Sequence, residues 1–363
     1  MSAAAAEASA ISWSVAERVA VRVAGREPLA ESYLYDSLQP DFAELTAEAE
    51  ELVTAATGLT SLAGPARARV TDRAGWIRAN IASFQRLLRP LTDKVEPKLA
   101  KSRMAPVGRA VTGAQMGTML GWMSSRVLGQ YDLLLIEEER PEDQDIVYFV
   151  GPNILALEKR FGFPPREFRL WLALHEVTHR VQFTGIPWLR PHFLGLVEST
   201  LGGIDPDPKR FREALRRAVD EVRAGTNPLA DGGLVGLLAG PEQQAMLSQV
   251  GGLMSLLEGH GDVTMDRAGA DRIPSAARFG AVLRERRARV RGPAKLLQQI
   301  VGLEAKMKQY EQGERFIEAL EAAGGPALLD RVWRGPEWLP TMDEIRHPVQ
   351  WMARTGDEVS AAG

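Results

Sequence analysis

The sequence predicts a mainly α protein of the α+β class, in which a small antiparallel sheet packs on one buried helix. Apolar residues recur at helical spacing from about Pro40 to Tyr131. Two short β-rich segments follow, Asp132–Ile136 and Asp145–Val150, and a long apolar helix carries H-E-x-x-H at residues 175–179. We therefore expect three regions: an N-terminal helical region (1–130), a metal-binding core (131–265) and a C-terminal helical region (266–363).

The N-terminal region contains one apolar segment, Ala105–Leu128, that could be either a buried or a membrane-spanning helix. Its glycines at positions 113, 117 and 121 recur every four residues. Glycines at this spacing line one face of a helix and allow a second helix to approach closely. Because Arg109 and Arg126 lie near its ends and the rest of the protein is polar, we predict a buried helix.

The middle of the chain predicts a hairpin followed by helices. We expect Asp132–Ile136 to pair antiparallel with Asp145–Val150, the second strand lying at the sheet edge beside the motif helix and the first lying deeper. Prolines 164 and 165 suit the first turn of that helix, and Gly185 is expected to end it. Residues 187–208 are predicted to form a loop. Pro241 is predicted to open a further helix that ends near His260.

Composition and charge exclude several classes of partner and site. Forty-four Lys and Arg against 47 Asp and Glu give a net charge of −3, so neither nucleic acid nor a membrane is expected as a partner. The arginine-rich segment 284–291 includes Glu285 and is interpreted as a solvated helix face. The chain has no cysteine, which excludes disulfides and cysteine zinc sites and suits a reducing cytoplasm. Since residues 1–10 lack the pattern of a signal peptide, we expect a cytoplasmic protein.

The motif that carries the chemistry is His175-Glu176-Val177-Thr178-His179. Residues four apart lie on one face of a helix, so both imidazoles can reach a single metal ion. Zinc lowers the pKa of a bound water towards 7, and Glu176 stands beside the first ligand, where it can accept the proton. Two histidines on a buried helix need polar partners, which favours a zinc site over an ordinary amphipathic helix.

Three residues compete for the place of the third zinc ligand. Catalytic zinc takes three protein ligands and one water. His192 lies in a proline-rich segment, whereas Glu258 and His260 lie on the helix that Pro241 opens. Glu258 and Asp262 are four residues apart and share a face, so one carboxylate can bind the metal while the other orients a zinc-bound histidine. This E-x-x-x-D pattern resembles the glutamate zincins (gluzincins), and we favour Glu258 as the ligand with Asp262 supporting the site.

Longer stretches of the chain resemble a known family. Residues 150–154, residues 168–179 with Gln182-Phe183, and several C-terminal segments, among them 302–310, are similar to a family of actinobacterial zincin-like proteins. These proteins are provisionally catalogued as hydrolases or zinc-dependent metalloproteases, and some are labelled as associated with biosynthesis of the deazaflavin coenzyme. The resemblance extends over most of the chain beyond residue 40. It implies a zincin-like core with a zinc site, flanked by helical regions, and does not imply a particular substrate.

The function we favour is a zinc-dependent metallopeptidase or hydrolase of the gluzincin type that cleaves a peptide or amide bond. In zincin chemistry Glu176 would activate the water and protonate the leaving amine, and a second group would stabilise the oxyanion. Candidates for that group are Tyr310, His347 and Tyr148, of which we prefer Tyr310. Two alternatives remain: a non-catalytic zinc-binding protein, which a fourth protein ligand would favour, and an accessory factor in coenzyme assembly. The sequence predicts no oligomeric state.

Overall fold

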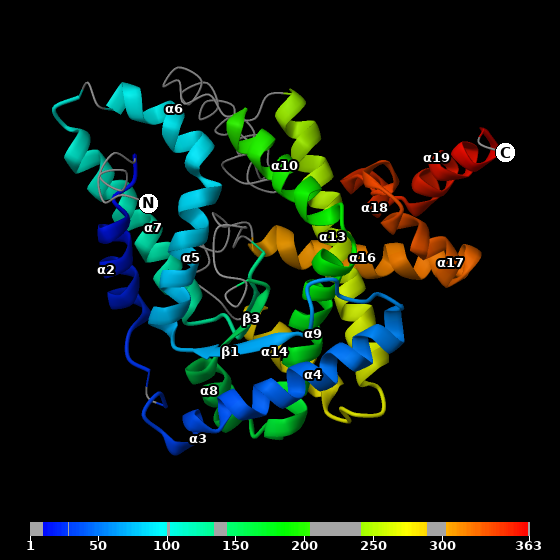
Figure 1. Cartoon of the computed structure of the whole chain (residues 1–363), viewed down its shortest axis with the longest axis horizontal. Coiled ribbons are helices and arrows are strands. Elements are labelled where there is room, and N and C mark those ends of the chain that lie inside the picture. Colours follow the sequence, from blue (N-terminus) through cyan, green and yellow to red (C-terminus); the bar gives the residue numbers. More distant parts are fainter. Residues whose placement is uncertain are drawn as a thin grey trace. The chain divides into compact units, whose positions relative to one another are not determined.

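The computed structural model describes residues 10–27, 29–99, 102–133, 144–203, 241–288 and 303–361. The chain forms two compact units, one made of Met1–Gly185 with Arg267–Leu283 and the other of Ile186–Asp266 with Arg284–Gly363. Both units are largely helical, and the sheet belongs to the first (Figure 1). The predicted fold class, mainly α with a small sheet, is confirmed. The division into three regions stays a prediction.

The described elements of the first unit follow one another along the chain with the strands interspersed among the helices. The helices are α2 (Trp13–Ala24), α3 (Tyr33–Asp36), α4 (Leu38–Thr57), α5 (Arg73–Leu87), α6 (Arg89–Leu99), α7 (Ala105–Ser124), α8 (Gly151–Phe161) and α9 (Pro165–Gly185). The strands are β1 (Arg67–Thr71), β2 (Gly129–Tyr131) and β3 (Ile146–Val150). Helix α14 (Ala276–Ala288) begins in this unit.

The sheet is mixed and not antiparallel as predicted, with the strand order β1-β3-β2. Strand β1 pairs parallel to β3, and β2 pairs antiparallel to it with Gly129 opposite Phe149. All five residues of β3 are buried, so the expectation that this strand forms the edge was wrong. Its antiparallel partner lies at residues 129–131 and not from Asp132 onwards, while residues 134–136 lie outside the described part of the chain. Strand β1 falls within the region predicted to be helical. The sequence did not predict it because its two arginines hide any apolar alternation.

Helices α2, α5 and α7 pack together on one side of the sheet, as Figure 1 shows. The glycines at 113, 117 and 121 of α7 face the carbonyl groups of Ser12, Ala16 and Ala20, along the start and length of α2, and a Cβ on any of them would overlap that backbone. The spacing therefore permits the close helix pair that the sequence predicted, but α7 is buried on this face only, and Val107 and Val111 are more than half exposed. No helix within the described residues has the length and apolarity needed to cross a membrane.

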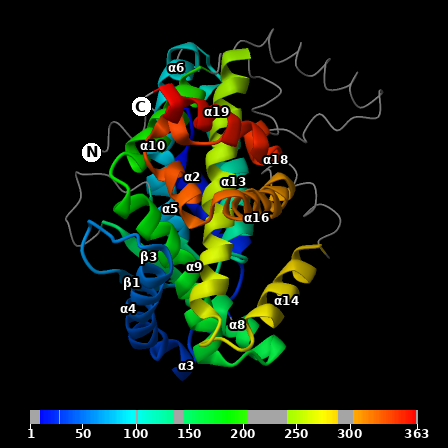
Figure 2. The same ribbon diagram turned by 90° about the vertical axis from the view of Figure 1, so that its right-hand side faces the viewer.

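The other face of the sheet packs against α4 and α9 (Figure 2). The rings of Phe42 on α4 and Phe149 on β3 stack with their centroids 3.9 Å apart, and Tyr131 on β2 stacks on Phe183 of α9 at 6.2 Å. Phe149 and Phe42 are fully buried, so this contact contributes on the order of a few kcal/mol to stability. The consequence is that α9 lies directly against β2.

The second unit is helical throughout its described residues. It contains α10 (Leu189–Gly202), most of α13 (Pro241–Gly269), α16 (Leu303–Gly324), α17 (Pro326–Leu329), α18 (Met342–Arg346), α19 (Pro348–Ala361) and the short 3-10 turns η2 (Asp330–Trp333) and η3 (Pro336–Trp338). A core of Leu256, Phe316 and Trp351, with smaller apolar side chains, joins α13, α16 and α19.

Two expectations for this unit were wrong. Residues predicted as a loop form α10, because Pro191 stands in the first turn of that helix, where the missing N–H costs nothing. Helix α13 does not end near His260 but continues to Gly269. Its Gly259 lies against the backbone of Gly313, so this glycine serves the crossing of α13 and α16 and not a helix end (Figure 2). The segment 204–240, with a predicted helix at 209–224, lies outside the described residues.

We expect Gly117→Ala to lower the free energy of unfolding by about 1–3 kcal/mol, because the added methyl group would overlap the Ala16 carbonyl oxygen. The matched control is Gly195→Ala in α10, where a Cβ meets nothing within 4 Å. There the better helix propensity of alanine should raise stability by up to about 1 kcal/mol. Urea unfolding followed by circular dichroism measures both. Equal effects of the two substitutions would contradict the close packing of α2 and α7.

Candidate metal centre

Helix α9 carries the two histidines, and buried charges hold it in the first unit. Arg180 has no exposed surface and donates to the Glu50 carboxylate at 2.8 Å and to the carbonyl oxygens of Gly64, Pro65 and Asp145 at 2.7–3.2 Å. Six residues before the first histidine of the motif, Arg169 bonds Glu158 and Asp41. Burial raises the pKa of Glu158, whereas its hydrogen bonds from Arg169 act in the opposite direction. These contacts fix α9 against its neighbours.

His175 and His179 lie one turn apart, as the motif predicts. Their ring centroids are 4.7 Å apart and the ring planes are nearly perpendicular at 88°. His179 Nδ1 lies 3.0 Å from Gln182 Oε1. With Nδ1 protonated, His179 donates to this fully buried amide and keeps the lone pair of Nε2 for a metal.

The carboxylate of Glu176 is held at the outer edge of β2. Tyr131 N donates to Glu176 Oε2 at 3.0 Å. Because Asp132 N and Leu128 O bond to β3, the alternation of an antiparallel pair directs the backbone groups of Gly129 and Tyr131 away from β3. A Cβ at Gly129 would lie 2.7 Å from both Cγ and Oε1 of Glu176, so only glycine leaves room for this carboxylate.

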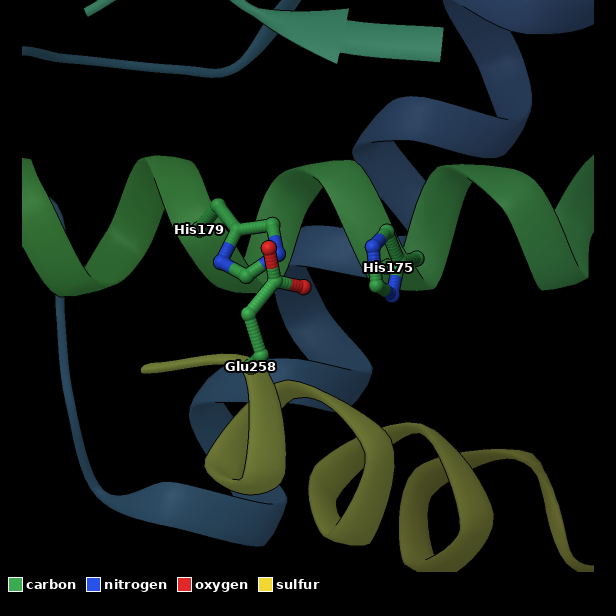
Figure 3. Close-up of side chains that lie close together, drawn as sticks. All are labelled: His175, His179 and Glu258. Carbon is green, nitrogen blue, oxygen red and sulfur yellow. The ribbon is translucent and has the colours of Figure 1, made fainter. Parts of the chain in front are cut away.

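Glu258 on α13 completes a group of three donors. One ligand atom from each of His175, His179 and Glu258 lies within 4.8 Å of the others, and Figure 3 shows the three side chains close together. Glu258 is 3% exposed, so its carboxylate is removed from solvent. Two imidazoles and one carboxylate form a donor set that zinc uses in catalytic sites, and a buried carboxylate needs a partner of this kind. The donor set therefore fits zinc.

The two other candidates for the third ligand have different surroundings. His192 lies on α10 with its ring centroid 6.0 Å from that of Trp188, and burial lowers its pKa. His260 packs against Trp333 at 5.3 Å and lies 3.5 Å from the Thr264 hydroxyl. Neither belongs to the group of donors found among the described residues.

The remaining predicted residues are placed as follows. Tyr148 neighbours Phe149 in β3 and so faces the side of the sheet opposite α9, where its hydroxyl lies 3.5 Å from Arg69. Tyr148, a candidate for stabilising the oxyanion, therefore does not face the motif helix. His347 follows α18, and Asp262 lies one turn after Glu258 on α13. Tyr310 falls on α16, but its side chain lies outside the described residues, so its role stays a prediction.

Sequence reasoning missed three residues around the motif. Gln182 follows His179 by three residues, and this helical spacing could have identified it as a partner of the imidazole. Gly129 and Tyr131 lie more than forty residues before Glu176, and no spacing in the sequence connects them. Only the pairing of β2 and the packing of α9 bring them together.

Comparisons with known proteins agree with this geometry. A family model described as zincin-like metallopeptidase matches residues 11–352. A crystal structure from Chloroflexus aurantiacus, provisionally described as a hydrolase with a novel fold, is 31% identical with a TM-score of 0.70. The match covers 95% of this chain and 99% of that one. No curated protein matches the chain.

We expect Gln182→Leu to weaken zinc binding by about 10–100-fold, because His179 loses the acceptor that orients its ring. Gln182→Glu retains an acceptor oxygen at the same place and should bind zinc at least as tightly as the unchanged protein. Competition with a chromophoric chelator measures both affinities. Equal affinity in the leucine and glutamate variants would exclude an orienting role for Gln182.

Proposed function

Because the chain belongs to the zincin-like metallopeptidase family, we propose that it is a zinc-dependent metallopeptidase or amide hydrolase of the gluzincin type. The observation that carries the proposal is the group of His175, His179 and Glu258, whose donor atoms lie within 4.8 Å of one another. A zinc ion held by these residues supplies a Lewis acid for hydrolysis. Asp262, one turn beyond Glu258, is proposed to support the donor set.

Glu176 is proposed to be the general base. Its carboxylate is 9% exposed and stands beside His175 on the motif helix, with one oxygen held by Tyr131 N. The carboxylate is proposed to take a proton from the attacking water and to pass it to the leaving amine. Tyr310 remains the proposed group that stabilises the oxyanion.

We place an extended peptide substrate along β2. Side chains bond backbone groups on the outer side of β1, since the Gln39 amide bonds both Ala68 O and Val70 N and the Glu50 carboxylate accepts from Ala66 N just before the strand. This closes one edge of the sheet to strand addition. The other edge is β2, where Glu176 takes the outward N–H of Tyr131, and we propose that an added strand pairs with the outward carbonyl groups of β2 and so brings its backbone to the base.

The number of donors bears on the non-catalytic alternative. A structural zinc site has four protein ligands, whereas the described residues contribute three to this group. Three ligands leave a coordination position for water, and a base beside them has a use only in catalysis. The set therefore supports the enzyme. No contact of the described residues favours an accessory role in coenzyme assembly.

We expect the purified protein to contain about one zinc per chain, as a three-ligand site requires. His179→Ala and Glu258→Ala should lose most of it, because each removes one donor, whereas Glu176→Gln should keep it. Elemental mass spectrometry measures the metal, and a library of quenched fluorescent peptides measures hydrolysis. Glu176→Gln is expected to lower hydrolysis by at least about 100-fold. A protein without metal even after reconstitution would exclude the enzyme, and zinc retained in Glu258→Ala would exclude Glu258 as a ligand.

We expect Gly129→Ala to lower hydrolysis while zinc content stays unchanged. The new methyl group would meet the flexible end of the Glu176 side chain and not rigid backbone, so the carboxylate moves and the fold persists. Peptide hydrolysis, zinc content and thermal unfolding are measured on the same preparation. Unchanged hydrolysis would show that the place of Glu176 beside β2 does not matter for activity.

A further inference from the structure

Tyr131 is held at three points. Its N–H donates to Glu176 Oε2 at 3.0 Å, and its hydroxyl donates to Asp145 Oδ1 at 2.7 Å. Its ring stacks on Phe183, with centroids 6.2 Å apart and an interplanar angle of 24°. The residue is 6% exposed. A backbone N–H fixed in this way has little freedom to move away from the carboxylate that it binds.

Asp145, which anchors the Tyr131 hydroxyl, has an unusual backbone. Among the described residues other than glycine, only Asp145 has a positive φ, which is 54°. This conformation is unfavourable for a residue with a Cβ and persists where the surroundings require it. Here both the side chain and the main chain of Asp145 accept hydrogen bonds. The carboxylate accepts from the Tyr131 hydroxyl, and the carbonyl oxygen accepts from Arg180 Nε at 3.2 Å.

These contacts form a closed path between the motif helix and β2. The path runs from Glu176 through Tyr131 to Asp145, and it returns to α9 at Arg180, one turn after Glu176. All four residues are at most 9% exposed, so water does not compete strongly with these bonds. A hydrogen bond to a carboxylate is stronger and more directional than one between neutral groups.

We propose that Tyr131 and Asp145 are positioning residues for Glu176, with Asp145 setting the place of Tyr131 and the Tyr131 N–H setting the place of the carboxylate. The proposal rests on the proposed function, in which Glu176 is the general base. It assigns a positioning role to the Asp145 carboxylate. Removal of this carboxylate should displace Glu176 and leave the metal ligands in place.

The test is a spectrum that needs neither zinc nor substrate. The chain has five tyrosines, so the full-length protein labelled with [15N]tyrosine gives five backbone amide peaks, and Tyr131→Phe identifies the one from Tyr131 by its loss. An amide bonded to a carboxylate resonates downfield. We expect Glu176→Gln to move the Tyr131 amide proton upfield, and Asp145→Leu to move it in the same direction.

The matched control is Asp145→Asn, whose side-chain oxygen can still accept from the Tyr131 hydroxyl, and its spectrum should stay close to that of the unchanged protein. If Asp145→Leu does not fold, Tyr131→Phe labelled with [15N]phenylalanine replaces it, since it breaks the same bond and adds one peak to those of the eleven native phenylalanines. That peak is expected upfield of the native Tyr131 amide.

Two results overturn the proposal. An amide that does not move in Glu176→Gln shows that Tyr131 does not hold the carboxylate. An amide that moves in Glu176→Gln but keeps its native shift in Asp145→Leu, or in Tyr131→Phe if that variant replaces it, shows that Asp145 does not position it. Both results are independent of zinc content and peptide hydrolysis, so they separate this proposal from a failure of the proposed function.

Discussion

The structure around the candidate centre depends on the burial of one guanidinium. Arg180 lies next to His179 on α9 and has no exposed surface, and a charge in such a place is tolerated only when its hydrogen bonds are satisfied. Its partners come from α4, from the segment before β1 and from the residue before β3. One side chain therefore fixes the motif helix relative to both the sheet and the helix that covers it.

This constraint explains why backbone atoms of β2 lie against Glu176. Once Arg180 has fixed α9 against the sheet, β2 passes so close to the motif that Gly129 has no space for a Cβ. A main-chain N–H, that of Tyr131, then donates to the carboxylate. A main-chain donor in a paired strand is rigid, which suits the positioning of a base better than a mobile side chain would. A main-chain donor can come from almost any residue type, so the sequence does not identify it.

The parts of the fold that were predicted correctly are those with local causes. The bounds of α9 are predicted by the prolines at its start and by Gly185 at its end, and the α7 glycines predict a close helix pair. The errors in the sheet have a different origin, since each concerns pairing between distant segments. Strand β1 finds its parallel partner far along the chain, and the short β2 is defined only by its bonds to β3. The motif is local as well, so His175, Glu176 and His179 could be named, but Tyr131 and Gly129 could not.

The third donor illustrates the limit of local reasoning. A helix offers two donors to one ion at positions four apart, and the next residue on that face, Phe183, lies about 6 Å further along the axis and is apolar. Another segment must supply the third donor, and spacing alone cannot say which. The sequence predicted that this helix ends near His260, which would leave Glu258 in its last turn. Instead, Gly259 packs on Gly313 and α13 continues for ten more residues, to Gly269, so Glu258 projects from the interior of a packed helix. A carboxylate held in this way loses little conformational entropy on binding an ion, which is what a preorganised ligand requires.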